Sequence, residues 1–299
     1  MSLSSVNTNI GAQIALQSLN STTTALQKAQ KQISTGYRVA DASDDGGAFA
    51  VAEKVRSDVS ALTSVNTALG NTKGLVGVTS SALSSLSSSL TDAKGLLVRI
   101  GDNSITSTQR DQYVATYKEL VQTVANTVDG ATYNGQSLVG SAAGAVAGTS
   151  KTVINNEHGS TSTIASADNS GLANTLAGLI GSSFSRTAGG VDTLGVVTST
   201  AAQTAAVAAL ATGGSFDVAQ TALGNQLNQT GADSNFIDHT ITQNSAKIDN
   251  LNTGIGSLVD ANLAQESAAL QSLQIKQQLG TQSLSIANQA PQALLSLFK

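Results

Sequence analysis

Apolar residues recur at every seventh position between residues 55 and 97. This ladder contains only aliphatic side chains: Val55, Leu62, Leu69, Val76, Leu83, Leu90 and Leu97. A seven-residue apolar repeat places one stripe along a helix and favours packing against a partner helix. Glycines would weaken this helix in isolation, and we expect them to be points of close packing: Gly70, Gly74, Gly77 and Gly95.

A second apolar ladder occupies the C-terminal part of the chain. Its members follow one another at steps of three, four, seven or ten residues, apart from a polar gap near residues 230–234: Phe216, Leu223, Leu227, Ile237, Ile241, Ile248, Leu251, Ile255 and Leu258. These steps keep the side chains on one face of a helix. The two ladders are natural partners, so we predict long paired N- and C-terminal helices in an antiparallel coiled-coil rod.

Both ends of the chain are apolar at helical spacing but carry almost no charge. No side chain is charged in residues 1–27 or in residues 277–298. A soluble helix normally keeps a charged face toward water, whereas disordered tails lack apolar periodicity. We therefore expect the two ends to be helices buried against other helices on several sides through these residues: Leu3, Val6, Ile10, Leu19, Leu26, Ile33, Leu270, Leu273, Leu284, Leu294, Leu297 and Phe298.

The stretch from residue 141 to about residue 200 has a different texture, rich in Gly, Ser, Thr and Ala. Residues 152–154 and 162–164 are β-branched or small, and they flank Glu157-His158-Gly159, which predicts a short hairpin. Just before this stretch, Tyr133-Asn134-Gly135-Gln136 is a turn signal. The expected fold class is mainly α, with a small central insert that contains a β-hairpin.

Composition excludes several classes of protein. Fifteen basic residues face nineteen acidic ones, and the sequence pI is about 5.0, which disfavours nucleic-acid binding. No apolar run is long enough to span a membrane. The chain has no Cys and only two His, so thiol chemistry is excluded and a His-rich metal centre is disfavoured. The first residues lack a secretory signal pattern, so the protein either stays inside the cell or leaves without a cleaved signal.

Candidate catalytic and metal motifs are weak. Residues 41–46 imitate the start of a calcium loop, with Asp41, Ser43 and Asp45 followed by Gly46. The twelfth position is Ala52, where calcium needs a bidentate Glu, so a loop that starts a helix is the favoured interpretation. Metalloprotease, dinucleotide, P-loop and serine-hydrolase motifs are absent. We expect no enzyme activity, no cofactor and no metal.

Several blocks resemble the bacterial flagellin family, and they fall in the family's order at both ends of the chain. The matching blocks are residues 6–9, 33–39, 42–48, 133–138, 258–267, 283–289 and 294–299. The resemblance covers about residues 1–140 and 215–299, and the middle has no counterpart, as expected for a family whose centre varies. One segment, residues 90–99, is similar in composition to alphaproteobacterial flagellins.

The resemblance implies a structural subunit that self-assembles into the helical filament of the bacterial flagellum and serves motility. It further implies secretion through the type III flagellar export apparatus, an export chaperone, and contact with hook-associated and cap proteins. An alternative is the hook–filament junction protein, whose ends look similar but which forms a short adaptor ring. No nucleic acid and no membrane insertion are implied.

The resemblance also implies a division of the chain. Residues 1–42 and 256–299 would form the filament core, where the twelve apolar residues named above for the two ends would be the subunit contacts. Residues 43–140 and 201–255 would form the tube around it. Residues 141–200 would be a small variable outer segment, whose Ser and Thr side chains are equally compatible with O-glycosylation and with a solvated polar loop. Four residues are expected to set the joint between core and tube: Gly36, Arg38, Asp44 and Asp45.

The segment that typically activates the Toll-like flagellin receptor departs from the family pattern. Asp92 stands where the family usually has Arg, and Gly95 stands where it usually has Glu. Reversing one charge and removing another weakens a charge-complementary interface. We therefore expect weak receptor stimulation or none.

Overall fold

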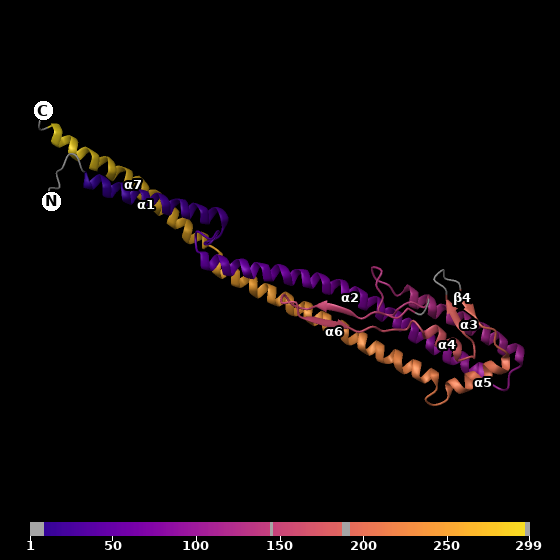
Figure 1. Cartoon of the computed structure of the whole chain (residues 1–299). Helices are drawn as coiled ribbons and strands as arrows, with labels where there is room; N and C mark the ends of the chain where they lie inside the picture. The colour runs from indigo at the N-terminus through magenta and orange to yellow at the C-terminus, as the bar shows by residue number, and fades with distance from the viewer. Residues whose placement is uncertain (1–8, 144–145, 187–191, 297–299) are drawn as a thin grey trace. The chain divides into compact units, whose positions relative to one another are not determined.

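The computed structural model describes residues 9–143, 146–186 and 192–296, and the side chains only as far as residue 289. The chain forms two compact units, Met1–Val59 with Asp249–Lys299, and Ser60–Ile248. The order of elements is shown in Figure 1: α1 (Ile10–Thr35), α2 (Gly46–Gly101), α3 (Ser107–Gly130), β1 (Lys151–Ile154), β2 (Thr161–Ile164), α4 (Leu172–Gly178), β3 (Phe184–Arg186), β4 (Asp192–Leu194), α5 (Ser199–Leu210), α6 (Ser215–Val259) and α7 (Leu263–Ser296).

In the first unit, α1 and α7 lie side by side and run antiparallel (Figure 1). The side-chain amide of Asn9 donates to the carbonyl oxygen of Ala287 at 2.7 Å, which ties the start of α1 to the far part of α7. Further along, Leu19 packs closely on Gly280, where a β-carbon would lie 3.2 Å from a Leu19 methyl group. The prediction of long, paired N- and C-terminal helices is confirmed.

In the second unit, α2 and α6 form another antiparallel pair. Moving along α2, Asn66 donates to Ser245 at 3.3 Å, Lys73 binds Asp238 at 2.5 Å, and Lys94 lies 5.7 Å from the ring centre of Phe216. In these three contacts, the residue number in α6 falls as the residue number in α2 rises, as antiparallel packing requires. Every ladder residue from Leu62 to Leu97 is 2% exposed or less, so the seven-residue repeat correctly marked the buried stripe.

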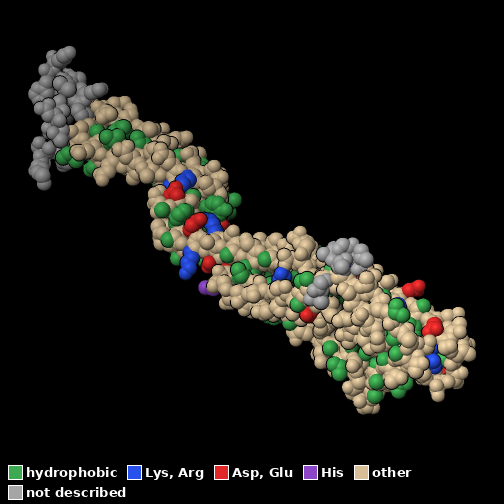
Figure 2. Space-filling view, turned by 45° about the vertical axis from the view of Figure 1, so that its right-hand side comes forward, with side chains coloured by type: hydrophobic (Ala, Val, Ile, Leu, Met, Phe, Trp, Pro, Cys, Tyr) green, Lys and Arg blue, Asp and Glu red, His purple; other side chains and the backbone are tan. Residues whose placement is uncertain are grey.

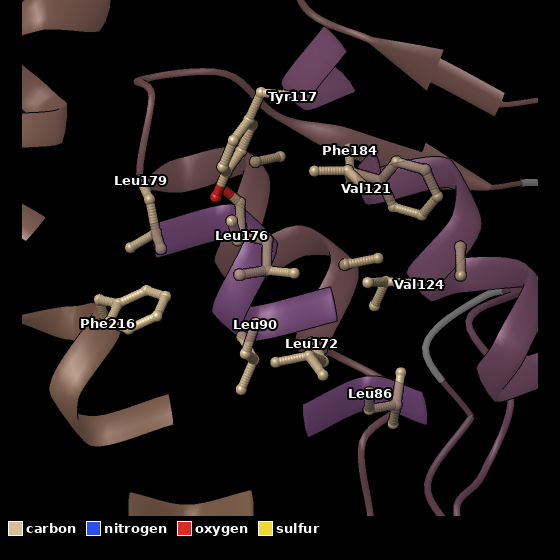
Figure 3. Packing of buried hydrophobic residues seen from close by; sticks show 14 of the residues in the cluster. Leu86, Leu90, Tyr117, Val121, Val124, Leu172, Leu176, Leu179, Phe184 and Phe216 are labelled. Carbon is tan, nitrogen blue, oxygen red and sulfur yellow. The ribbon is translucent and has the colours of Figure 1, made fainter. Parts of the chain in front are cut away.

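The larger core of the second unit gathers around the far part of α2 (Figure 3). Aliphatic side chains of α2, α3 and α4 meet there, with Phe216 of α6 and Phe184 of β3 at the margin. Tyr117 is completely buried, and its hydroxyl donates to the carbonyl oxygen of Leu176 at 3.0 Å. Burial raises the pKa of Tyr117, so the hydroxyl keeps its proton and the hydrogen bond.

The central insert contains two small antiparallel hairpins. The first pairs β1 with β2, with Thr152 opposite Thr163, so the predicted hairpin is confirmed. It lies along the α2–α6 pair in Figure 1, and Asn244 of α6 donates to the Asn155 carbonyl oxygen at 3.1 Å. The second hairpin pairs β3 with β4 and was not predicted, because its strands have three residues each and little alternation.

The expectation that four glycines of α2 are close-packing points is wrong for three of them. Nothing lies within 4 Å of a β-carbon added at Gly70, Gly77 or Gly95. At Gly74, by contrast, such a carbon would lie 2.8 Å from Cζ of Tyr133. The seven-residue repeat predicts packing on only one face of the helix. These three glycines lie on other faces, against which no segment packs in the described part of the chain.

Hydroxyl groups on the long helices are hydrogen-bonded to the helices' own backbone. Along α2, nine Ser and Thr hydroxyls donate to the backbone carbonyl oxygen four residues earlier at 2.9–3.1 Å. They are those of Ser64, Thr67, Thr72, Thr79, Ser81, Ser84, Ser85, Ser89 and Thr91. This bonding satisfies the hydroxyl hydrogen without water or a second side chain. The Ser- and Thr-rich composition is therefore compatible with long helices.

One ion cluster holds the outer part of the second unit together. The Arg186 side chain is 6% exposed and binds Asp192 at 2.5 Å and Asp129 at 2.6 Å. The other Asp129 oxygen accepts from the Ser141 hydroxyl and from the backbone N–H of Ala142. Burial by itself would raise the pKa of Asp129, but these hydrogen bonds hold it below its usual value.

We expect Asp129→Asn to lower the free energy of unfolding by about 1–2 kcal/mol at neutral pH, because an amide N–H would face the Arg186 guanidinium. The pKa of Asp129 is depressed in the folded state, so its contribution is present above about pH 4 and is lost as the pH falls further. Urea unfolding followed by circular dichroism should show the two proteins converging in acid. Glu119→Gln, an exposed change on the same helix, is the control. A constant difference at all pH values would contradict the assignment.

Candidate functional site: the terminal helix pair and its junction

Helix α7 carries apolar side chains on two opposite faces. One face packs toward α1 and is half-buried, with Leu270, Leu273 and Leu284. The other face is free of α1: Ile275 is 58% exposed, Leu279 is 56% exposed and Ile286 is 68% exposed. At about 100° per residue, the second group lies roughly opposite the first. We call the first face the seam and the second the outward stripe.

Helix α1 has the same two-faced arrangement. Leu19, Leu26 and Ile33 lie at seven-residue steps on the side that packs within the unit, and Leu26 is 9% exposed. Ile10 and Ile14, which are 47% and 62% exposed, lie roughly opposite them and belong to the outward stripe. Figure 2 shows green patches on one face of this helix pair within a surface that is mostly tan.

Most of the described residues predicted as subunit contacts therefore lie in the seam, within the monomer. Ile10 is the one of them that the structure places in the outward stripe. Leu3, Val6, Leu297 and Phe298 lie outside the described residues, and Leu294 belongs to α7 but its side chain is not described. The predicted set left out four members of the outward stripe, Ile14, Ile275, Leu279 and Ile286, and also the exposed Leu16. A second apolar stripe opposite the first was the signal that could have found these four residues.

The outward stripe lies on a surface with almost no charge. The described part of α1 has no charged side chain before Lys28, and α7 has one, Lys276, between Glu266 and its end. Gln, Asn, Ser and Thr occupy most of the remaining exposed positions of the two helices. Such a surface has apolar area to bury and few ions to desolvate, which suits association.

The junction at the base of this helix pair begins at Gly36. Its φ of 75° is left-handed, where glycine is favoured, and its N–H donates to the Gln32 carbonyl oxygen at 2.9 Å to close α1. Its own carbonyl oxygen accepts from the N–H of Ala261 at 2.9 Å, which brings the α6–α7 connection against the end of α1. Gly36 therefore both ends a helix and joins two segments of the chain.

Arg38 continues this junction through its backbone and its side chain. Its N–H donates to the Val259 carbonyl oxygen at 2.7 Å, and its guanidinium donates to the Leu258 carbonyl oxygen. The carbonyl oxygen of Arg38 in turn accepts from the Gln32 side chain at 3.1 Å. Arg38 thereby caps the last carbonyl groups of α6, a place where a cation is favoured.

Asp44 is held in the junction by Lys31, a residue that the sequence did not single out. The Lys31 ammonium binds Asp44 at 2.8 Å and Asp41 at 2.6 Å. The same Asp44 oxygen accepts from the N–H of Ala40 at 3.0 Å. The hydrogen bond from Lys31 is the main reason that the pKa values of Asp41 and Asp44 are lowered. The signal available in the sequence was a basic residue, Lys31, ten residues before Asp41 and the acidic cluster.

Asp45 starts α2. One oxygen of its side chain accepts from the N–H groups of Gly47 at 3.1 Å and Ala48 at 3.0 Å, as a helix N-cap residue does. The interpretation of residues 41–46 as a loop that starts a helix is confirmed. Asp45 therefore bonds the start of its own helix, whereas Gly36, Arg38 and Asp44 bond the end of α1 to the segments beside it.

The two departures in the receptor segment lie on the surface of α2. Asp92 and Gly95 are exposed, whereas their neighbours Ala93 and Leu97 are buried in the core of the second unit. A residue at either position can therefore be changed in charge without disturbing the packing of the helix.

Other site chemistry is sparse in the part of the chain that the structure describes. Within that part, no three His, Cys, Asp or Glu side chains are grouped so that they could hold a metal ion. Nor does any helix there have the length and hydropathy needed to cross a bilayer.

The fold and this surface define a helical protein whose terminal helix pair presents an uncharged apolar stripe. Residues 6–143 match the model of the bacterial flagellin N-terminal helical region, and residues 214–298 match that of the bacterial flagellin C-terminal helical region. The chain belongs to the bacterial flagellin family.

Full-length relatives agree with this membership. Flagellin FljO of Caulobacter vibrioides is 33% identical over 299 residues that cover 100% of both chains. A flagellin of Brucella melitensis is 32% identical and covers 99% of this chain and 100% of its own. Flagellin C of Rhizobium meliloti is 31% identical with the same coverage. These relatives confirm the resemblance to alphaproteobacterial flagellins.

The protein is therefore a structural subunit that polymerises with copies of itself into the flagellar filament, and it is not an enzyme. Nothing in these matches favours the alternative of a hook–filament junction protein.

We expect Asp44→Asn to loosen the junction, because Lys31 and the N–H of Ala40 lose a charged acceptor. The pKa of Asp44 is depressed in the folded state, so its contribution is present above about pH 4 and is lost as the pH falls below that value. Hydrogen exchange at residues 36–45 should be faster in the variant at neutral pH and similar to wild type in acid.

The matched control is Asp58→Asn, a carboxylate of the same unit for which no ion pair is recorded. Equal exchange in the Asp44 variant and the wild type at neutral pH would show that the junction does not depend on this carboxylate.

Proposed function

We propose that the uncharged helix pair α1–α7 is the filament core and that its outward stripe makes the contacts between subunits. The observation that carries this proposal is the exposure of large aliphatic side chains on a pair that its own unit leaves uncovered. Fully burying an Ile or Leu side chain contributes roughly 1.5–3 kcal/mol. Burial of five half-exposed side chains in every subunit would strongly favour assembly. These side chains are Ile10, Ile14, Ile275, Leu279 and Ile286.

The seam has a different role in this proposal. Leu19, Leu26 and Ile33 on α1, with Leu270, Leu273 and Leu284 on α7, hold the two helices together within each subunit. The pair then enters the filament as one body. The predicted contacts that lie outside the described side chains, Leu3, Val6, Leu294, Leu297 and Phe298, would extend the contact surface toward the ends of the chain.

In the same proposal, residues 1–42 and 256–299 form the core, residues 43–140 and 201–255 the tube, and residues 141–200 the variable outer segment. Gly36, Arg38, Asp44 and Asp45 set the joint between core and tube. Support comes from the dense hydrogen bonding of the junction, which fixes where α1 ends and where α2 begins.

The finer cellular role rests on family membership. We infer that the chain leaves the cell unfolded through the type III flagellar export apparatus, with an export chaperone, and is added to the filament beneath the cap. The hook-associated proteins would join its filament to the hook. The absence of Cys suits a chain that is exported and must not cross-link.

The main test is seeded polymerisation followed by negative-stain electron microscopy. Wild-type protein should extend the seeds into long filaments, whereas Ile286→Gln and Leu279→Gln should remain monomeric, because each places a polar group in a contact that must become dry. Both positions are more than half exposed in the monomer, so the helical circular dichroism should not change.

Ile286→Val is the matched control, since it keeps an apolar side chain at the same position and should still assemble. Leu26→Gln, in the seam, should lower the helical signal of the monomer. If the two Gln variants formed filaments at the wild-type yield, the outward stripe would not be part of the contact between subunits.

A second test concerns the receptor segment. Because Asp92 and Gly95 are exposed, the expected weak stimulation of the Toll-like flagellin receptor should be reversed by Asp92→Arg combined with Gly95→Glu. Reporter cells exposed to nanomolar monomer measure the response. Asp111→Arg, an exposed charge reversal on another helix, is the control. A strong response to the wild-type protein would contradict the proposal.

A further inference from the structure

A cleft of about 320 Å³ with both polar and apolar lining lies within the second unit, where three separate segments meet. Helix α2 contributes Asn71 and Leu75, the turn after α3 contributes Tyr133 and Gln136, and β1 contributes Lys151. All the residues that line the cleft belong to the second unit, and the inference that follows does not depend on the proposed filament contacts.

An aromatic ring is held at the edge of this cleft. Tyr133 and Gln136 exchange two backbone hydrogen bonds of 2.9 Å across the two-residue Asn134-Gly135 turn, whose φ values are 50° and 71°. Such a pair places both side chains on the same face of the turn. Tyr133 leans on α2 at Gly74, where only the absence of a β-carbon leaves room for the ring, and yet it is 36% exposed.

The polar side chains around the ring are free to bind a ligand. In the described part of the chain, no hydrogen bond or ion pair involves the side-chain amides of Asn71 and Gln136 or the ammonium of Lys151. Amides offer both donors and acceptors, which match the hydroxyl groups of a sugar. An aromatic ring with Leu75 beside it offers apolar surface to the C–H face of a sugar ring.

The charge of the cleft indicates which class of sugar it would bind. Lys151 is the only ionic side chain that lines the cleft among the residues described, and no carboxylate lines it. A ligand with one carboxylate would be attracted by Lys151 and would meet no repulsion from the protein. We propose that this cleft binds a hexuronic acid unit of an acidic saccharide, with its ring on Tyr133, its hydroxyls at Asn71 and Gln136, and its carboxylate at Lys151.

The test uses the full-length monomer and D-glucuronate, followed by saturation-transfer difference NMR. Binding is expected in the millimolar range, as for a small ligand in an open cleft. Lys151→Gln should weaken glucuronate binding about threefold, the scale of one exposed ion pair, and leave glucose binding unchanged. Lys28→Gln, at an exposed site in the other unit, is its control.

The ring is tested by a matched pair of substitutions on α2. Gly74→Ala should displace Tyr133 and weaken glucuronate binding at least tenfold, without removing any side chain of the cleft. Gly77→Ala meets nothing within 4 Å and should bind like wild type. Tyr133→Leu should match Gly74→Ala, and circular dichroism confirms that each variant is folded.

Three results would overturn the proposal. These are no saturation transfer from wild-type protein to glucuronate, equal binding by wild type and both ring variants, or glucose binding as tight as glucuronate binding.

Discussion

Pairing of a helix from the first part of the chain with one from the last part is the interaction on which the structure depends. With 3% aromatic residues and 11% charged residues, the chain has few large side chains with which to fill a globular core. Two long helices solve this by burying one aliphatic residue every other turn against each other. The buried stripe of α2 runs from Leu62 to Leu97, and from Leu83 onward it also forms part of the core around Tyr117, where α3, α4 and α5 pack.

The terminal pair α1–α7 also packs through an aliphatic stripe, but it leaves more of its apolar surface exposed. Its seam is sufficient to hold two helices together, but its outward stripe leaves aliphatic side chains half-exposed. Two helices alone cannot cover all their own apolar surface, so in the proposed filament neighbouring subunits would supply part of the stability of this pair. The hydrogen bonds of Gly36, Arg38 and Asp44 at the end of α1 are, by contrast, made within the subunit itself.

Periodicity in the sequence was sufficient to predict the helices, their pairing and the first hairpin. The identity of the Asn134-Gly135 pair predicted the turn, because only a few residue pairs accept two left-handed conformations. The β3–β4 hairpin was not predicted because its strands have only three residues each, and the role of Lys31 was missed because its partners lie in the loop after its helix. Most of the predicted contacts lie in the seam, because a ladder identifies the strongest stripe and says nothing about which neighbour covers it. The three-part division of the chain and the subunit contacts stay predictions.

The serine and threonine hydroxyls of α2 have a further consequence. Each donates to the backbone of its own helix, so its hydrogen bond is internal and travels with the helix. A Lys or Glu at the same position would have to give up its hydration, or find a counter-ion, whenever another molecule covered it. A surface of this kind is hydrophilic in water and nearly neutral toward dehydration. At these hydroxyl positions, a neighbour that covered the helix would leave no ion without water or a counter-ion, in whatever register the neighbour lay.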